Sequence, residues 1–202
     1  MPYLVQQSFT ARYCPLVEQV PNFASVRCGI GPSTSLYQYH LSIGDKLPER
    51  IVQQSPHKAL PDFLHSVGSW IVSQAFKDVV EQVGKGANEF LPIPVFDRKG
   101  VPAAQNYYFL DVREIKQAID FDASSGQWEE HHGSRLFTPL PGFGPGFGFD
   151  LAIDVEKVEG VHIWREPEHM QFDFFFSDKL VAAIKKAKLK DLRYTKLRVL
   201  ET

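Results

Sequence analysis

The chain has 202 residues, of which 44% are hydrophobic and sixteen are Phe, and its formal net charge is −2 at neutral pH. This length fits one domain that can bury a sizeable core. The near balance of charge argues against a protein that coats nucleic acid or that binds a membrane through a polybasic surface.

The cysteine content and the first residues favour a cytoplasmic protein. Only Cys14 and Cys28 occur, which is too few for the close pairs of a zinc site and sparse for a disulfide framework. Residues 1–7 lack the basic region and apolar core of a signal peptide, and no run of twenty apolar residues is present. We therefore expect a reducing compartment and no membrane span.

The first half of the chain predicts strands at 3–11, 36–43, 70–73 and 107–111, because apolar residues alternate there or are β-branched and aromatic. Two prolines make residues 90–96 an edge strand or an extended connector. Pro61 can open a short helix. Residues 111–114 (DVRE) resemble a capping box, which predicts a helix over 111–119 with a strand as the alternative.

The second half predicts strands at 135–140, 161–165, 172–176 and 192–194, and residues 128–134 form a polar segment. Charge is distributed unevenly here. Residues 111–178 hold fourteen acidic and five basic side chains, and residues 179–202 hold two acidic and eight basic ones. A solvated face is one explanation. The acidic segment also predicts a surface that steers a basic partner.

Two segments share one pattern, a strand followed by a capping serine and an amphipathic helix. Counted from Ser73 and from Ser177, apolar residues fall at the same offsets, −3 to −1 before the serine and +3, +6, +7 and +10 after it. These offsets place one apolar stripe along each helix. We expect Ser73 and Ser177 to be N-caps, with Gly84 near the end of the first helix. Internal duplication and coincidence both explain the pattern.

Residues 139–149 read PLPGFGPGFGF. A phosphate-binding loop is excluded because the glycine spacing fails and no Lys-Ser/Thr pair follows. Phe143, Phe147 and Phe149 therefore either pack back onto the domain or contact a partner, since aromatic side chains are common at interaction hot spots.

Possible metal ligands occur in two groups, Glu129, Glu130, His131 and His132, and His162 with Glu166, Glu168 and His169. Neighbouring strand residues point to opposite faces, so we expect no metal site. His162 is expected to be structural, paired with a carboxylate or carbonyl, and Arg165 to be a partly buried ion-pair donor. Neither capping serine lies in a Gly-x-Ser-x-Gly elbow, and no group of nucleophile, base and oxyanion donor is evident.

Four segments together resemble the immunity-protein-eleven family of bacterial polymorphic toxin systems, long listed as a domain of unknown function. They are LPDF with IVS and FKDVVE (60–81), FLPIPV with YYFL (90–110), AID with Ser124 (118–124), and HIWR with FSDKL and LKDLRY (162–194). The resemblance spans residues 60–195, and residues 1–59 are assigned to the same domain. The family usually has glycine where this chain has Asp191, and the Gly/Phe loop with the charged stretch before it looks like an addition.

The resemblance implies a protein that protects its producer by binding a toxin encoded beside it. We predict a single α+β domain with a mixed, mostly antiparallel sheet, which neutralises a cognate toxin without catalytic residues, cofactor, metal or nucleic acid. The alternatives are a hydrolase that reverses the toxin's modification and an adaptor without a toxin. The predicted partner-binding residues are Trp128, Glu129, Glu130, His131, His132, Phe143, Phe147 and Phe149.

Overall fold

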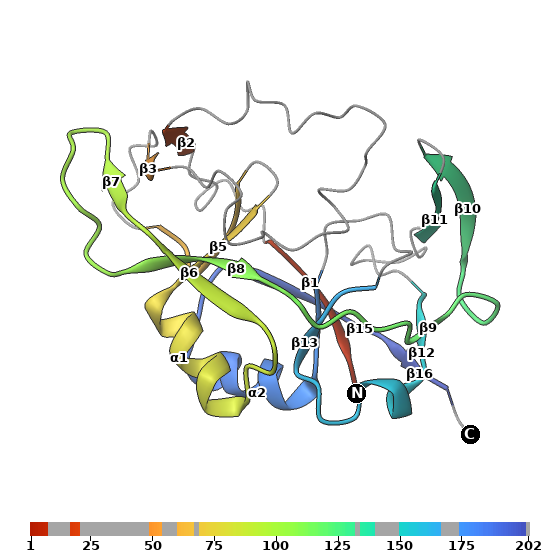
Figure 1. The fold of residues 1–202 in the computed structure, drawn as a ribbon. Coiled ribbons are helices and arrows are strands. Elements are labelled where there is room, and N and C mark those ends of the chain that lie inside the picture. The colour runs from red at the N-terminus through yellow and green to blue at the C-terminus, as the bar shows by residue number, and fades with distance from the viewer. Residues whose placement is uncertain are drawn as a thin grey trace.

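The computed structural model describes residues 1–7, 17–20, 49–53, 60–66, 69–131, 134–139, 150–166 and 174–200 (Figure 1). The predicted strand at 36–43 and the Gly/Phe loop lie outside these residues. Within these residues, two α-helices and many strands are present, and the fold is of the α+β class as predicted. Most strand pairs are antiparallel, and β3–β7 and β12–β16 are parallel.

The helices among the described residues are α1 (Gln74–Val83), α2 (Asp178–Lys186) and the short 3-10 helix η2 (Val155–Val158). The strands are β1 (Tyr3–Gln7), β2 (Val17–Val20), β3 (Arg50–Gln53), β4 (Phe63–Ser66), β5 (Ser69–Ser73), β6 (Glu89–Ile93), β7 (Val95–Asp97), β8 (Tyr107–Asp111), β9 (Ile119–Asp120), β10 (Gly126–His131), β11 (Ser134–Pro139), β12 (Ala152–Ile153), β13 (Ile163–Trp164), β14 (Phe174–Phe176), β15 (Leu192–Lys196) and β16 (Arg198–Val199).

Two four-stranded antiparallel sheets form the centre of the molecule, with strand orders β4-β5-β8-β6 and β13-β14-β1-β15. In each sheet, the strand at one edge pairs with the next strand along the chain, and this second strand leads into a helix. The strand that follows the helix lies at the opposite edge of the sheet. We call β4, β5, α1, β6 and β8 the first unit, and β13, β14, α2, β15 and β1 the second unit. The two units differ in one connection, because β1 comes from the N-terminus whereas β8 follows β6.

The strand registers of the two units are equivalent. Phe63 pairs with Val72, directly before the first capping serine, as Ile163 pairs with Phe176 before the second. Across the central strand, Val72 pairs with Tyr108, and Phe176 pairs with Tyr3. The predicted pair of strand–serine–helix units is therefore part of a larger repeat of strand order and register.

Aromatic packing at the far edge repeats as well. Phe90 and Tyr108 meet edge to face with ring centroids 6.4 Å apart, and Tyr194 and Tyr3 meet in the same way at 6.4 Å. The interplanar angles are 85° and 81°. Such edge-to-face pairs are favoured by the aromatic quadrupole.

Both helices begin as the sequence predicts. The hydroxyl of Ser73 accepts a hydrogen bond from the Phe76 amide, and the hydroxyl of Ser177 accepts one from the Leu180 amide. Each bond satisfies an amide that the first helical turn leaves free. Gly84 follows the last residue of α1 with a φ of 132°, a conformation that favours glycine.

The helices pack against each other below the two sheets (Figure 1). Their apolar stripes and the sheet faces above them form one core to which both units contribute buried side chains, among them Phe63, Trp70, Phe76, Val80, Phe174, Phe176, Leu180 and Ile184. The opposite face of the first sheet packs on β3 and β7, and that of the second packs on β9, β12 and η2. The sheets are thus covered on both faces.

Two helices predicted from the sequence do not form. Residues 112–118 are extended, which agrees with the alternative to a helix, and Ile115 bridges to Arg165 beside β13. The residues after Pro61 form strand β4 because they pair with β5. In the polar segment, residues 128–131 lie in β10, which forms a hairpin with β11. Neither α-helix of the described chain has the length and apolar character needed to cross a membrane.

Candidate functional site

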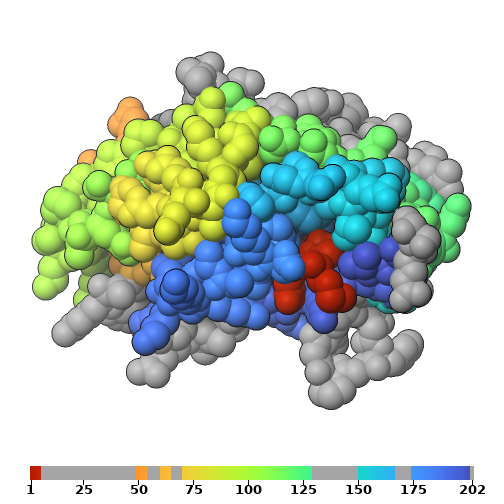
Figure 2. Space-filling model, turned by 90° about the horizontal axis from the view of Figure 1, so that it is seen from below, coloured from red at the N-terminus to blue at the C-terminus, as the bar shows by residue number. Residues whose placement is uncertain are grey.

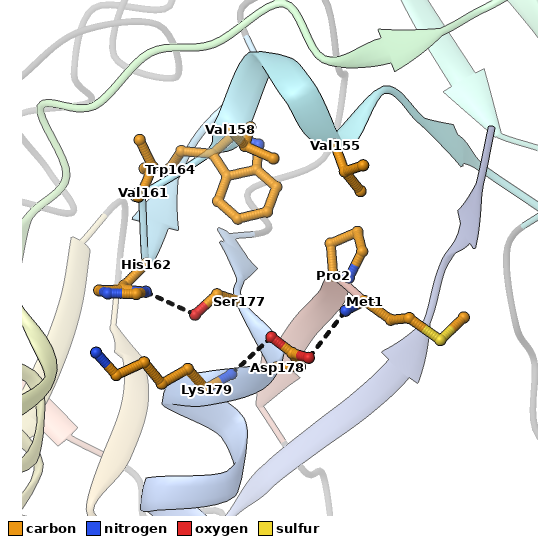
Figure 3. Close-up of a pocket in the computed structure, with 11 residues that line it drawn as sticks. Met1, Pro2, Val155, Val158, Val161, His162, Trp164, Ser177, Asp178 and Lys179 are labelled. Carbon is orange, nitrogen blue, oxygen red and sulfur yellow. Dashed lines mark hydrogen bonds and ion pairs between the residues drawn. The ribbon is translucent and has the colours of Figure 1, made fainter. Parts of the chain in front are cut away.

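A pocket of about 310 Å³ opens at the N-terminal end of α2. We call it the cap pocket. Residues from β1, η2, β13 and α2 line it: Met1, Pro2, Val155, Val158, Gly160, Val161, His162, Trp164, Ser177, Asp178 and Lys179. Pro2 and Val155 face His162 and Trp164 across the hollow (Figure 3). Segments far apart in the sequence therefore meet at one surface.

The base of the cap pocket is the N-cap of α2. Besides accepting the Leu180 amide at 3.2 Å, the hydroxyl of Ser177 lies 2.9 Å from Nδ1 of His162. The backbone joins the same two residues, because the amide of Ser177 donates to the carbonyl of His162 at 3.1 Å. Pairing of β13 with β14 thus fixes the imidazole beside the serine.

The Ser177–His162 pair is also what a hydrolytic site would use, since a neutral histidine can activate a hydroxyl. Burial, with the nearby charge of Lys179, lowers the pKa of His162 and keeps its ring neutral at physiological pH. However, Ser73 in the first unit makes the equivalent contact. Its hydroxyl donates to Asp62 at 2.7 Å, and its amide donates to the Asp62 carbonyl at 3.0 Å.

Asp62 and His162 occupy equivalent positions in the two units. Asp62 directly precedes Phe63, and His162 directly precedes Ile163; each of these two residues pairs with the last strand residue before a capping serine. Ser73 is fully buried, so its contact serves only the cap. The Ser177–His162 pair therefore has a complete structural explanation as a cap contact. The expectation that His162 is structural agrees with this geometry, although its partner is a hydroxyl rather than a carboxylate or carbonyl.

Charged groups surround the mouth of the cap pocket. The terminal ammonium of Met1 lies 3.0 Å from Asp178, and this contact lowers the pKa of that carboxyl. Lys179 reaches away from the pocket to the carbonyl of Val83 at 3.5 Å, at the end of α1. The space-filling view shows the N-terminal residues between the segment of η2 and α2 (Figure 2).

The inner wall is Trp164, which is fully buried and stacks on Phe175 at 5.6 Å. Its indole nitrogen donates to Glu166 at 3.0 Å. Glu166 also accepts the amides of Ala118 and Ile119, so one buried carboxylate joins β13 to the strand that covers it. Burial raises the pKa of Glu166 to about 7, although the hydrogen bonds from these three N–H donors lower it.

Of the predicted partner-binding residues, the structure describes the side chain of Trp128 alone. It is half-buried, and its ring lies 4.7 Å from that of Phe121 at the edge of the core behind the cap pocket. The backbone of Glu129, Glu130 and His131 lies in β10, paired with β11. His132, Phe143, Phe147 and Phe149 lie outside the described residues.

Arg165 is partly buried, as predicted. Nε and Nη2 of its guanidinium find no hydrogen-bond partner among the described residues. Burial lowers the pKa of this side chain, while the charge of Asp111 raises it. The ion pair of Arg165 stays a prediction. In the part of the chain that the structure describes, no group of three His, Cys, Asp or Glu side chains could hold a metal ion.

Sequence reasoning did not find the cap pocket. Pro2, Val155 and Val158 are small apolar residues without a motif, and they meet because β1 from the N-terminus pairs with β14. The only signal was the capping serine with His162 nearby in sequence.

The model of the immunity protein family Imm11 matches residues 30–199, most of the chain. The chain therefore belongs to the Imm11 immunity protein family. No curated protein matches it.

Proposed function

We propose that this protein binds a cognate toxin and neutralises it in a stoichiometric complex without catalysis. The observation that carries this proposal is the family match over residues 30–199. An immunity protein of this kind protects the cell that makes the toxin, and an interface of roughly 1,200–2,000 Å² with nanomolar or tighter affinity is normal for such a task.

The geometry supports binding rather than catalysis. The best candidate for a catalytic pair, Ser177 with His162, is a cap contact that Ser73 and Asp62 make in the first unit. The bound amide of Leu180 also occupies the serine oxygen. A hydrolase that reverses the toxin's modification remains the second candidate, because a neutral imidazole and a hydroxyl do lie beside a pocket.

The partner we propose is a toxin with a basic contact surface, because residues 111–178 carry a large acidic excess. The contact region would include the predicted residues in and after β10, namely Trp128, Glu129, Glu130, His131, His132, Phe143, Phe147 and Phe149. We propose the cytoplasm as the place where the complex forms. Membrane and nucleic acid have no part in this function.

Co-expression tests the proposal. The toxin encoded beside the gene is expressed with and without this protein, and growth and co-purification are measured. We expect growth only when both are present and recovery of a stable complex from the same cells. Growth arrest despite soluble, folded protein would overturn the proposal. An unrelated immunity protein of the same expression level serves as the control for nonspecific protection.

A further inference from the structure

The two units differ most in what fills the space beside the cap. Tyr107 in β8 and Pro2 before β1 occupy equivalent positions in the two units. Tyr107 directly precedes Tyr108, which pairs with the last residue before Ser73. Pro2 directly precedes Tyr3, which pairs with the last residue before Ser177. Tyr107 is 3% exposed and packs in the outer core of the first unit with Leu64. Leu64 is in turn the equivalent of Trp164 in the wall of the cap pocket.

The phenol of Tyr107 ends beside the first cap. Its hydroxyl donates to the carbonyl of Leu60 at 3.3 Å, and burial together with the charge of Asp62 raises its pKa to about 12. In the first unit, an aromatic ring of the protein itself therefore occupies the space next to the residue that holds the capping serine.

In the second unit, the short ring of Pro2 cannot fill the equivalent space. The cap pocket of about 310 Å³ lies there instead, next to His162, the equivalent of Asp62 (Figure 3). Apolar side chains of η2 and Val161 form the wall opposite the cap. The hollow is thus shaped by the same scaffold that encloses a tyrosine in the first unit.

The η2 side of the cap pocket, opposite the Met1 ammonium and Lys179, has an acidic excess. On η2 and in the turn after it, Glu156 and Glu159 are exposed, and neither forms an ion pair among the described residues. The nearby Lys157 lies 3.4 Å from Asp154, so its charge is already compensated. A basic segment would therefore be attracted to this side of the pocket.

We propose that the cap pocket receives an aromatic side chain of the toxin, presented by a segment with Lys or Arg next to it. This inference rests on the proposed function and adds the cap pocket to the surface that contacts the toxin. The ring occupies the space that Tyr107 fills in the first unit and reaches His162, while the basic neighbours meet Glu156 and Glu159. Docking also covers the apolar side chains of Met1 and Val155, which are 51% and 38% exposed.

Filling the pocket from within tests the inference. Pro2→Tyr restores the residue type of the first unit, and Val155→Tyr places a ring over the mouth from an exposed position. The matched control is Val101→Tyr, because Val101 is an exposed valine on the connection between β7 and β8 and does not line the pocket. The dissociation constant for the purified, inactivated toxin encoded beside the gene is measured together with each melting temperature.

We expect both pocket variants to weaken toxin binding by about thirtyfold or more, the effect of losing an interface hot spot, with melting temperatures near that of the wild type. Val101→Tyr should bind like the wild type. Unchanged affinity for Val155→Tyr, which does not depend on the core tolerating a new ring, would overturn the inference. If the wild-type protein itself failed to bind the toxin, the proposed function would fall with it.

A charge variant tests the basic segment. Glu156→Lys with Glu159→Lys should slow association at low salt by about tenfold and weaken its salt dependence, because rim charges act mainly on the association rate. The control is Asp78→Lys with Glu81→Lys, which reverses two exposed acids on α1. Equal association rates for both double variants would contradict a basic partner segment at this rim.

Discussion

The first and second units have the same strand order, the same registers and equivalent caps, yet they differ in the side chains that surround each capping serine. Asp62 holds the first capping serine, and the buried ring of Tyr107 packs beside that site. His162 holds the second, and Pro2 leaves a pocket. The shared features are those that a helix start and a paired strand require. The features that differ are the side chains beside each cap, and in the second unit they leave a hollow that is open at the surface.

The chain connection of the central strand also differs. β8 follows β6 directly, whereas β1 comes from the N-terminus and pairs with β14 and β15 near the other end of the sequence. The second unit therefore depends on contacts of long sequence separation.

The largest effect is expected when the second unit receives the wall residue of the first. Trp164→Leu copies Leu64, but it removes a fully buried ring and a donor to Glu166. We expect the free energy of unfolding to fall by ~3–5 kcal/mol, measured by urea denaturation. The control Trp128→Leu changes a half-buried indole and should cost much less. An equal loss of stability in the two variants would contradict the expectation that the buried ring of Trp164 contributes more to stability than the half-buried ring of Trp128.

The second effect depends on pH and concerns the buried carboxyl of Glu166. Its folded pKa of about 7 lies above the ordinary value of 4.5, so its proton stabilises the folded state below pH 4.5. That stability is lost as the pH rises through 7, and the change is about 3 kcal/mol. Between these pH values, the stability of the wild type should fall by this amount relative to Glu166→Gln.

Unfolding measured from pH 4.5 to 8 checks this expectation. Glu159→Gln, which changes an exposed carboxylate, is the matched control and should run parallel to the wild type. Parallel curves for Glu166→Gln and the wild type would contradict a raised pKa and would leave the carboxylate as a simple hydrogen-bond acceptor.

The two caps give a smaller, graded effect. Ser177→Ala should lower stability by ~1 kcal/mol through loss of an N-cap. Ser73→Ala should cost ~2 kcal/mol, because it also leaves the carboxylate of Asp62 without the buried hydroxyl that donates to it. Chemical denaturation of both variants measures the difference. Ser177→Thr should recover most of the loss, and toxin affinity per folded molecule should stay unchanged in Ser73→Ala, which lies in the first unit and does not line the cap pocket.

The smallest effect is expected at Asp191, which has a φ of 72°. This left-handed conformation explains why glycine suits the position in the family. Burial and the charge of Asp62 raise the pKa of Asp191 to about 6, so its charged form above that pH is unfavourable in the folded state. Asp191→Gly should stabilise the protein by up to about 1 kcal/mol, and more at pH 8 than at pH 5.

Lys188→Gly is the control, because Lys188 has a φ of 57° without a buried carboxylate. It should give a gain that does not change between pH 5 and pH 8, measured by thermal unfolding. If the stability gained by Asp191→Gly also did not change between pH 5 and pH 8, the whole gain would come from the left-handed backbone conformation and none from the buried carboxylate.

The sequence predicts features that depend on neighbouring residues. The caps at Ser73 and Ser177, the strand at Tyr107–Asp111 and the edge position of the proline-containing β6 are all confirmed. Each follows from a local rule: a hydroxyl for free amides, alternation for a strand, and a missing amide for an edge.

Features that depend on distant partners escaped the sequence analysis. The apparent capping box after Asp111 is not used, since Arg113 instead forms ion pairs with Asp111 and Glu89 and the chain continues extended beside β13. The cap pocket likewise exists because β1 lies next to β14. Which residue fills the space beside a cap follows from that tertiary pairing, and Pro2 carries no local sign of it.

The central claim is that protection is stoichiometric binding, and titration of the toxin's activity tests it most directly. Purified toxin at fixed concentration is mixed with increasing amounts of this protein, and residual activity is measured after short and long incubation. We predict that activity falls linearly to zero near equimolar protein and does not depend on incubation time. Loss or reversal of the toxin's effect at small catalytic amounts of protein, growing with time, would contradict the account and would identify an enzyme.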